Sequence, residues 1–496
     1  MKFHTSRRTW ILAALIMFTA FSLTAEGAVE QHTSAAHSGP QAKYVFLFIG
    51  DGMSTAQINA AESYANAQVS DDITVQHLRF SKFPVAGLTT TYDASSLITD
   101  SASSATAMAS GNKTLSGVIN MSTGKTEAFK LVSEYAREQG KKIGVVSTVS
   151  LNHATPAAFY AKVPSRGNYY DIAVQLTQSD FDYFGGGGFI QPDGKNGDQA
   201  NIFDLARNAG YTVADTDEEF HALTPSSGKV LAVNERLQSS SADMPYDIDR
   251  KAGELSLADY TAKGIELLSD DPDGFFMMVE SGKIDWSGHA NDAGASIHET
   301  LAFDAAVAQA IAFAEEHPDE TLIVVTGDHE TGGMTIGFAG TKYSTFFDEI
   351  GKQKMSFTAF DQEILGPYKE SLAGRKARFV EFLPSIEDAF GIEYGTLTAV
   401  QQDKLRTAFE RSMGNEVIVP QVEDVYLLYG GYEPLTMTIT HTLNEIAGIG
   451  WTTYSHTGVP VATFAKGAGQ DLFGGYYDNT KIFTSLMSAM GLSEQM

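Results

Sequence analysis

The chain has 496 residues, of which 43% are hydrophobic and 19% charged, and it carries a formal net charge of −27. This composition argues against disorder and predicts a large buried core, whereas the excess of acidic residues argues against nucleic-acid binding. The sequence contains no cysteine, so disulfides and thiolate metal sites are excluded, and any metal must bind histidine and carboxylate side chains.

The first 25 residues, Met1–Ala25, have the pattern of a signal peptide. Basic residues Lys2, Arg7 and Arg8 precede an uncharged apolar run, Trp10–Leu23. The run is shorter than the roughly 20 residues of a spanning helix, and no later segment is long and apolar enough to cross a bilayer. We therefore expect an exported protein, periplasmic or extracellular. The Arg7-Arg8 pair leaves open whether export uses the twin-arginine route.

Beyond a polar linker over residues 26–42, apolar runs alternate with amphipathic helical patterns. The predicted buried strands are Tyr44–Ile49, Lys142–Ser147, Gly274–Val279, Thr321–Thr326 and Pro460–Phe464. The predicted helices are Lys130–Gln139, Ala258–Ser269 and Ser296–Glu315. This alternation predicts an α/β fold with a mostly parallel central sheet and helices on both faces. In such a fold, ligands bind at the carboxyl ends of the strands.

Two segments depart from this alternation. Thr341–Glu433 combines charged and aromatic helical patterns with short predicted strands and lacks strand-end motifs, so we interpret it as an inserted subdomain. The catalytic α/β domain then consists of residues 43–340 and 434–496. The second segment, Phe184–Phe189, contains four consecutive glycines. It is predicted to form a tight turn rather than a phosphate-binding loop, because no Lys-Ser/Thr pair follows it.

The first candidate site residues in the chain are Asp51 and Ser101. Asp51 follows a predicted strand within Gly-Asp-Gly, a context in which a lone aspartate is usually a turn or cap residue. Ser101 lies in a run of small residues that opens a helix, where a lone serine is usually a cap but where free N–H groups also stabilise anions. Ser101 has no evident Ser-His-Asp relay, so a metal ion would be the natural means of ionising its hydroxyl.

Two later strand ends combine carboxylates with histidines. Glu280, Asp285 and His289 follow the third predicted strand, and the last two share a face if this segment is helical. The adjacent Asp328 and His329 follow the fourth strand. Such ligands suit cations such as zinc, although a surface ion pair would explain Asp285 and His289 equally well.

Four other residues complete the candidate set. His153 and Thr155 follow the second predicted strand, and His153 is a possible cation ligand. Arg166 has a planar guanidinium that matches two phosphate oxygens. His456 precedes the last predicted strand. The remaining helical or loop histidines lack acidic partners at ligand spacing and are interpreted as structural or solvated: His298, His317 and His441.

Together, the Asp-Ser-Ala, Glu…Asp-x-x-x-His and Gly-Asp-His segments resemble the alkaline phosphatase family, in order and across nearly the whole mature chain apart from the insert. Any one segment is weakly specific, whereas the three together are highly specific. The resemblance implies that Ser101 is the nucleophile and that Arg166 holds the non-bridging phosphate oxygens. It also implies one Zn²⁺ on Asp285, His289 and His456, a second Zn²⁺ on Asp51, Asp328 and His329, and a Mg²⁺ on Asp51, Thr155 and Glu280.

The sequence departs from the best-known enterobacterial pattern at two positions. His153 stands where that pattern has Asp, and Trp286 stands where it has Lys; both are expected to contact the substrate. The identity of the third ion stays open, because His153 either binds that ion or only orients its water ligands. The resemblance also implies a homodimer. In some marine bacterial members an insert near 341–433 reaches over the partner subunit.

The predicted function is the hydrolysis of small phosphate monoesters through a phosphoserine intermediate, with broad specificity because the leaving alcohol is barely contacted. A sulfatase would carry its nucleophile in Cys/Ser-x-Pro-x-Arg, whereas Ala-Ser-Ser follows Ser101. A phosphodiesterase or phosphonate hydrolase of the same superfamily usually lacks the counterparts of Arg166 and Glu280. A non-catalytic phosphate-binding protein would have lost the nucleophile or a metal ligand, and neither is lost here.

Overall fold

The computed structural model describes residues 41–70, 72–415 and 422–493. The predicted signal peptide and nearly all of the predicted linker lie outside the described residues. Among the helices within those ranges, none is long and apolar enough to cross a membrane.

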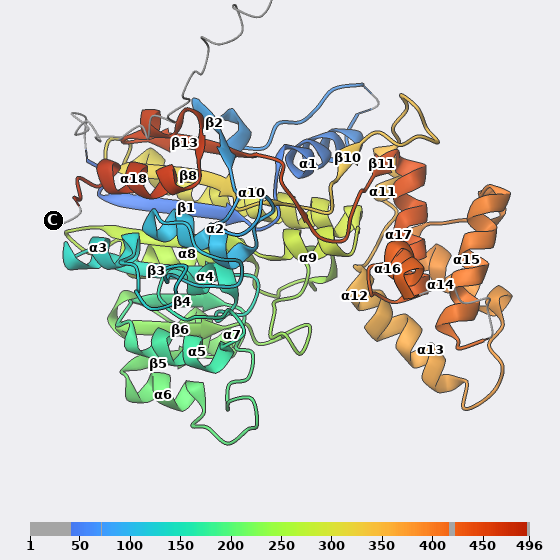
Figure 1. The fold of residues 1–496 in the computed structure, drawn as a ribbon, viewed down its shortest axis with the longest axis horizontal. Coiled ribbons are helices and arrows are strands. Elements are labelled where there is room, and N and C mark those ends of the chain that lie inside the picture. Colours follow the sequence, from blue (N-terminus) through green and yellow to red (C-terminus); the bar gives the residue numbers. More distant parts are fainter. Residues whose placement is uncertain (1–40, 71, 416–421, 494–496) are drawn as a thin grey trace, which may run out of the picture. The chain divides into compact units, whose positions relative to one another are not determined.

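In the described part of the chain, ten strands form one central sheet (Figure 1). Their order across the sheet is β14 (Gly475–Asp478), β2 (Val85–Thr90), β13 (Val461–Gly467), β8 (Thr321–Gly327), β1 (Tyr44–Gly50), β7 (Phe275–Ser281), β3 (Lys142–Ser147), β4 (Tyr183–Gly186), β6 (Lys229–Val233) and β5 (Tyr211–Ala214). β13 is antiparallel to its two neighbours, β8 and β2, and all other neighbouring strands pair in parallel. The predicted mostly parallel sheet is therefore confirmed.

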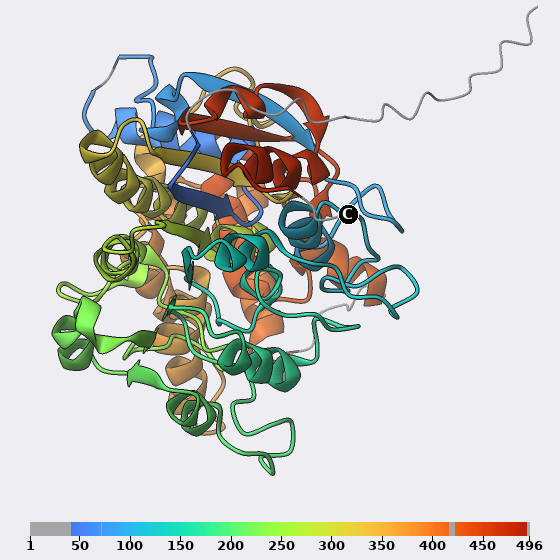
Figure 2. The same cartoon turned by 90° about the vertical axis from the view of Figure 1, so that its left-hand side faces the viewer.

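Helices cover both faces of this sheet, and Figure 2 shows the sheet between them. On one face Tyr44, Phe46 and Phe48 of β1 pack with α1 (Thr55–Ala67), α8 (Leu257–Leu268) and α10 (Ala293–Glu316). The alternate residues of β1 face a second cluster with α2 (Ser101–Ser110), α3 (Val132–Glu138), α4 (Ala154–Ala157), α5 (Tyr169–Gln178), α6 (Ile202–Asn208) and α18 (Thr480–Ala489). All seven residues of β1 are buried, which explains why the strand is a continuous apolar run.

Every strand and helix whose bounds were predicted is present, with ends displaced by at most three residues. The turn predicted at Phe184–Phe189 is wrong in its first half, because Gly185 and Gly186 belong to β4. Gly186 has a φ of +119°, and a Cβ atom there would lie 1.9 Å from the carbonyl oxygen of Ser147 on β3. The glycines therefore allow β4 to approach β3 closely.

The segment predicted as an insert is helical, and its described part contains no strand, so the short strands expected there are wrong. Its elements are α11 (Phe347–Ile350), α12 (Phe357–Ala359), η4 (Phe360–Leu365), α13 (Gly366–Ser371), α14 (Phe379–Phe390), η5 (Tyr394–Thr396), α15 (Ala399–Ser412) and α16 (Val422–Tyr429). Its aromatic residues pack on one another between these elements, for example Phe382 of α14 against Phe360 of η4 and Phe409 of α15. The helix that follows, α17 (Pro434–Ala447), packs against α11 and α15.

Several short elements complete the described fold. These are α7 (Asp217–Ala222), α9 (Lys283–His289), the 3-10 turns η1 (Phe80–Lys82), η2 (Pro225–Ser227), η3 (Asp247–Asp249) and η6 (Gln470–Phe473), and the antiparallel pairs β9 (Glu330–Thr331) with β12 (His456–Thr457) and β10 (Thr335–Ile336) with β11 (Ile449–Gly450). The pairing of β9 with β12 sets His456 opposite Thr331. The last predicted histidine is thereby joined to the segment that carries Asp328 and His329.

Candidate functional site

The predicted site residues meet at the carboxyl ends of β1, β3, β7 and β8. Asp51, Glu280 and Asp328 each directly follow or end one of these strands and are buried. A pocket of about 310 Å³ opens over them, lined by Ser101, His153, Arg166, Ser241, Asp285, Trp286, His289, Tyr432 and His456. His298, His317 and His441 do not line this pocket, in line with their structural interpretation.

Ser101 is the first residue of α2, and it does not cap the helix. The cap is Asp100, whose side chain accepts a hydrogen bond of 3.0 Å from the backbone N–H of Ser103. The Ser101 hydroxyl therefore remains available to the site. Its Oγ atom lies 3.2 Å from Nε2 of His329 and 3.5 Å from Oδ1 of Asp51. The side chain is buried and lines the pocket.

One carboxylate and two imidazoles form the first potential cation site. Because α9 is helical, Asp285 and His289 share a face, and their Oδ1 and Nε2 atoms are 3.4 Å apart. Nε2 of His456 lies 3.5 Å from the same Oδ1 atom and 3.2 Å from Nε2 of His289. Ligand atoms about 2.0 Å from a tetrahedral zinc lie about 3.3 Å from one another. The three side chains thus have the spacing that one zinc ion requires.

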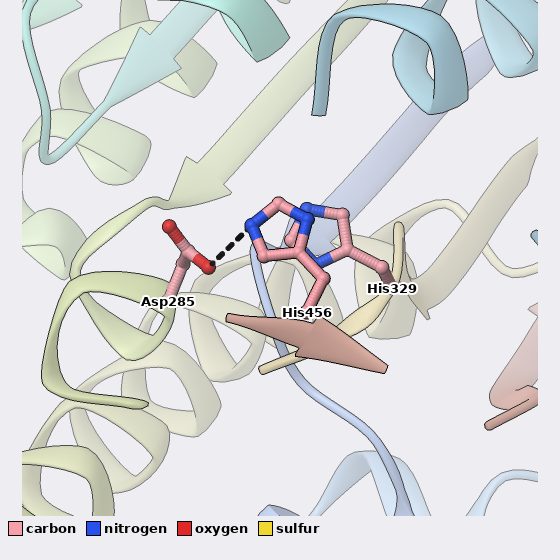
Figure 3. A group of neighbouring side chains, drawn as sticks. All are labelled: Asp285, His329 and His456. Carbon is pink, nitrogen blue, oxygen red and sulfur yellow. Dashed lines mark ion pairs between the residues drawn. The ribbon is translucent and has the colours of Figure 1, made fainter. Parts of the chain in front are cut away.

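Backbone carbonyls fix the orientation of both imidazoles. Nδ1 of His289 lies 2.6 Å from the carbonyl oxygen of Tyr454, and Nδ1 of His456 lies 2.8 Å from that of Thr99. A carbonyl only accepts, so both Nδ1 atoms carry a proton and both Nε2 atoms face the site, where each can bind a cation once it is unprotonated. Figure 3 shows the His456 ring beside Asp285 and against the ring of His329, from which its centroid is 3.6 Å away.

The second potential cation site consists of Asp51, Asp328 and His329, which are fully buried. Nε2 of His329 lies 3.3 Å from Oδ1 of Asp51 and 3.4 Å from Oδ2 of Asp328. Ser101 adjoins the same imidazole nitrogen. A cation held by this group would therefore lie next to the Ser101 hydroxyl.

A third group shares Asp51 with the second and adds His153 and Glu280. Thr155 lies nearby at the start of the short helix α4. Four buried polar atoms here make no hydrogen bond within the described residues: Asp51 Oδ2, His153 Nδ1, Thr155 Oγ1 and Glu280 Oε1. Buried oxygens without a donor are costly, and a hard cation would satisfy them.

The pKa shifts of the buried carboxyl groups also favour bound cations. Burial, together with the charges of Asp328, Asp285 and Glu280, raises the pKa of Asp51 well above its usual value. Burial likewise raises the pKa of Glu280 to about 8 and that of Asp328 to about 7. Burial opposes the ionisation of Asp285 too, but the neighbouring imidazoles, His289 first, lower its pKa well below the usual value. This many buried carboxyl groups ionise together only beside positive charge.

Arg166 supplies the permanent cation of the pocket. Its Nη1 atom donates to Oδ2 of Asp100 at 3.0 Å, and its Nη2 atom donates to Nε2 of His153 at 3.1 Å. Burial opposes the charge on Arg166, but the Asp100 carboxylate overrides it and raises the pKa of the guanidinium. Asp100 therefore caps α2 and also orients Arg166 toward the pocket in which Ser101 lies.

The pocket contains two residues that the sequence reasoning missed, Ser241 and Tyr432. Ser241 lies in the loop between β6 and η3, and Tyr432 follows α16. Neither has a motif or a strand end beside it, and no sequence signal separates them from other loop residues. The predicted Trp286 lines the pocket, with its ring 5.9 Å from that of His153 at 79°.

Comparison with known proteins gives consistent results. The sequence profile described as "Alkaline phosphatase" matches residues 42–492. "Alkaline phosphatase 3" of Bacillus subtilis is 31% identical over 490 residues, which are 96% of each chain. The structure of a cold-active alkaline phosphatase from the psychrophile Shewanella sp. is 28% identical, with a TM-score of 0.74, covering 90% of this chain and 99% of that one. A histidine-to-glutamate mutant of TAB5 alkaline phosphatase is 27% identical, with a TM-score of 0.62 and coverages of 92% and 99%.

Proposed function

The chain belongs to the alkaline phosphatase family and is a phosphomonoester hydrolase, and we propose that it acts by double displacement, with Ser101 as the residue that carries the phosphoryl group. The observation that supports this role is the Ser101 hydroxyl at the first turn of α2, which does not cap the helix and instead faces His329 and Asp51. This hydroxyl lies in the pocket, next to two potential cation sites and in the same cavity as Arg166.

Two Zn²⁺ and one Mg²⁺ are the cations that the donor sets fit. The assignment places Zn²⁺ on Asp285, His289 and His456 and on Asp51, Asp328 and His329, and Mg²⁺ on Asp51, Thr155 and Glu280. The ligand spacings near 3.3 Å support the zinc assignments, and the unpartnered oxygens support the magnesium assignment. The TAB5 mutant is described with Mg bound in its M3 site. Zinc supplies Lewis acidity, which lowers the pKa of a hydroxyl and stabilises a leaving alkoxide.

The protein's own residues then account for both displacements. Ser101 Oγ forms a bond to phosphorus, the bond to the ester oxygen breaks, and the alcohol leaves with a proton. A water molecule next attacks the phosphoserine, the bond from phosphorus to Oγ breaks, and Oγ regains a proton. Throughout, Arg166 binds two non-bridging oxygens, and its fork is held by Asp100. Phosphate and free enzyme are the products.

The phosphoserine is tested by labelling with radioactive phosphate and trapping at acid pH. The wild type is expected to be labelled, and Ser101→Ala to be unlabelled with turnover lower by several orders of magnitude. The matched control is Ser110→Ala at the other end of α2, whose hydroxyl bonds to the Thr106 carbonyl rather than facing the pocket. Labelling of Ser101→Ala at the wild-type level would overturn the assignment.

Monoester specificity and location are tested separately. The presence of Arg166 in the pocket supports monoesters over diesters, so 4-nitrophenyl phosphate should be cleaved far faster than its bis-ester. Export to the periplasm or medium, inferred from the pattern of Met1–Ala25, is tested by fractionating cells that express the full chain. Activity confined to the cytosol would contradict it.

A homodimer is the expected assembly, and 341–433 is the proposed contact. Deleting 341–433 with a short glycine linker should leave the metal ligands in place but weaken dimerisation and thermal stability. Light scattering measures the oligomeric state directly. An unchanged dimer in the deletion variant would exclude this role.

A further inference from the structure

Three residues of the pocket take no part in the phosphate or metal chemistry: Ser241, Trp286 and Tyr432. They come from three different parts of the chain, namely the loop after β6, the middle of α9 and the loop after α16. In the proposed mechanism Ser101 and Arg166 bind the phosphoryl group. The alcohol part of the ester would therefore contact these three residues.

Tyr432 is held in place by the helical segment that precedes it. Its backbone N–H donates to the carbonyl oxygen of Tyr429 at 2.9 Å, and its ring meets that of Phe357 edge-on at 5.8 Å and 88°. The backbone N–H of Phe357 in turn donates to buried Asp292 at 2.9 Å. Within the described residues, no hydrogen bond engages the Tyr432 hydroxyl, so its position depends on ring packing.

Trp286 is positioned by helix α9. It follows the zinc ligand Asp285 directly and lies one turn before His289. Trp286 and Tyr432 both pack on one small apolar cluster, which includes Tyr246, Ala290, Ala295, Phe357 and Met437. The two rings therefore share a support, and both are partly buried at the edge of the pocket.

We propose that Trp286 and Tyr432 form an aromatic subsite for the alcohol group, which biases the enzyme toward esters of ring-bearing alcohols, such as aryl phosphates. This inference rests on the proposed monoesterase function and adds a preference to its expected breadth. A planar ring that packs on these aromatic side chains gains stacking contacts that an alkyl chain cannot make. The gain corresponds to a preference of roughly three- to tenfold.

Non-hydrolysable inhibitors isolate this preference from leaving-group chemistry. Benzylphosphonate has the shape of phenyl phosphate, and ethylphosphonate has that of methyl phosphate. The measured quantity is the ratio of their competitive inhibition constants, taken for the metal-loaded wild type and for Tyr432→Leu, Tyr432→Phe and Trp286→Leu. The matched control is Tyr343→Leu, because Tyr343 lies in the same insert, 341–433, but is fully exposed.

The wild type is expected to bind benzylphosphonate about three- to tenfold more tightly than ethylphosphonate. Tyr432→Leu and Trp286→Leu should each reduce that ratio, whereas Tyr432→Phe and Tyr343→Leu should keep it. The inhibition constant of inorganic phosphate should not change in Tyr432→Leu, because phosphate does not reach the subsite.

Two results would overturn the subsite while leaving the phosphatase intact. One is an unchanged ratio in both leucine variants at Trp286 and Tyr432. The other is an equal loss in Tyr432→Phe and Tyr432→Leu, which would assign the effect to the hydroxyl instead of the ring. The proposed function itself would be overturned if the wild type neither hydrolysed phenyl phosphate nor was inhibited by phosphate. That result would refute the aromatic subsite as well.

Discussion

Nε2 of His153 lies 3.1 Å from Nη2 of Arg166. A guanidinium only donates, so this nitrogen accepts and the proton of the neutral ring is on Nδ1. Burial first, and then the charge of Arg166, lower the pKa of His153 to about 3, which keeps the ring neutral. A neutral imidazole has one lone pair. His153 therefore either supports Arg166 or binds a cation through Nδ1, and it cannot do both at once.

Replacing His153 by Asp removes this conflict, because a carboxylate has one oxygen for Arg166 and one for the cation. We expect His153→Asp to bind Mg²⁺ at least about tenfold more tightly than the wild type. Titration calorimetry on chelated protein reloaded with zinc measures this affinity. His153→Asn is the control, since it keeps an acceptor for Arg166 without the charge. Equal Mg²⁺ affinities in the two variants would show that the competition does not exist.

Trp286→Lys tests whether a missing cation sets the rate of phosphate release. An ammonium at this position should tighten phosphate binding roughly fivefold, even through water, and slow turnover at alkaline pH. The effect should shrink as salt rises. The inhibition constant of phosphate at two ionic strengths checks this. If that constant stays the same or increases while the metals remain bound, Trp286 acts only as an aromatic wall.

The metal-free protein should lose stability as pH rises. Glu280 and Asp328 have folded pKa values of about 8 and about 7, above their usual values, so the folded state holds protons that the unfolded chain releases near pH 4. These two groups therefore lower the free energy of unfolding between about pH 4 and pH 8, and the fall should be clearest above about pH 6.5, where the lowered pKa values of His153 and His329 no longer contribute the opposite slope. Thermal unfolding of chelated protein measures this trend.

Two controls define the origin of this pH dependence. Adding zinc and magnesium should stabilise the protein most at alkaline pH, because the carboxylates are then paired with cations. Glu280→Gln without metal should show a shallower decline than the wild type. A chelated protein whose melting temperature rises steadily from pH 5 to pH 8 would contradict the assignment.

Asp292 joins the helical insert to the rest of the fold. The buried carboxylate caps α10 through the Ala295 N–H and accepts from Gln353 and from the Phe357 N–H at 2.8 and 2.9 Å. Asp292→Ala leaves these donors without partners and should cost about 3 kcal/mol. The melting temperature measures the loss, with Asp348→Ala, an exposed carboxylate of the same segment, as control. Equal melting temperatures for both variants would show that Asp292 does not anchor the insert.

The strands predicted from the sequence consist mostly of buried residues, because such strands are near-continuous apolar runs. β1 and β8 are buried along their whole length, so their composition alone identifies them. β2 alternates buried and exposed positions and contains Gly87 and two threonines, which gives no comparable signal. β4 was missed because close approach to β3 requires glycine, the residue that normally indicates a turn.

The site residues likewise comprise some that local sequence rules predict and some that they do not. The rule that parallel strands end at one edge predicted that Asp51 and Asp328 would meet, because each follows a buried strand. Ser101 lies 228 residues from His329 in sequence, and no spacing rule relates the two. Their grouping came from the family resemblance. Tyr432 enters the pocket from a helical segment whose packing only the folded structure defines, so nothing local in the sequence identifies it.

Asp51 belongs to two of the three cation groups, with Oδ1 toward His329 and Oδ2 buried without a partner beside Glu280. One carboxylate can serve two cations only if its plane is fixed, and the first cation to arrive would fix it. The ion that binds first thereby prepares the place of the other ion that shares Asp51, and the second ion, once bound, slows the departure of the first. These two ions would therefore bind in a fixed order and leave in the reverse order, so that brief chelation removes one of them and leaves the other in place.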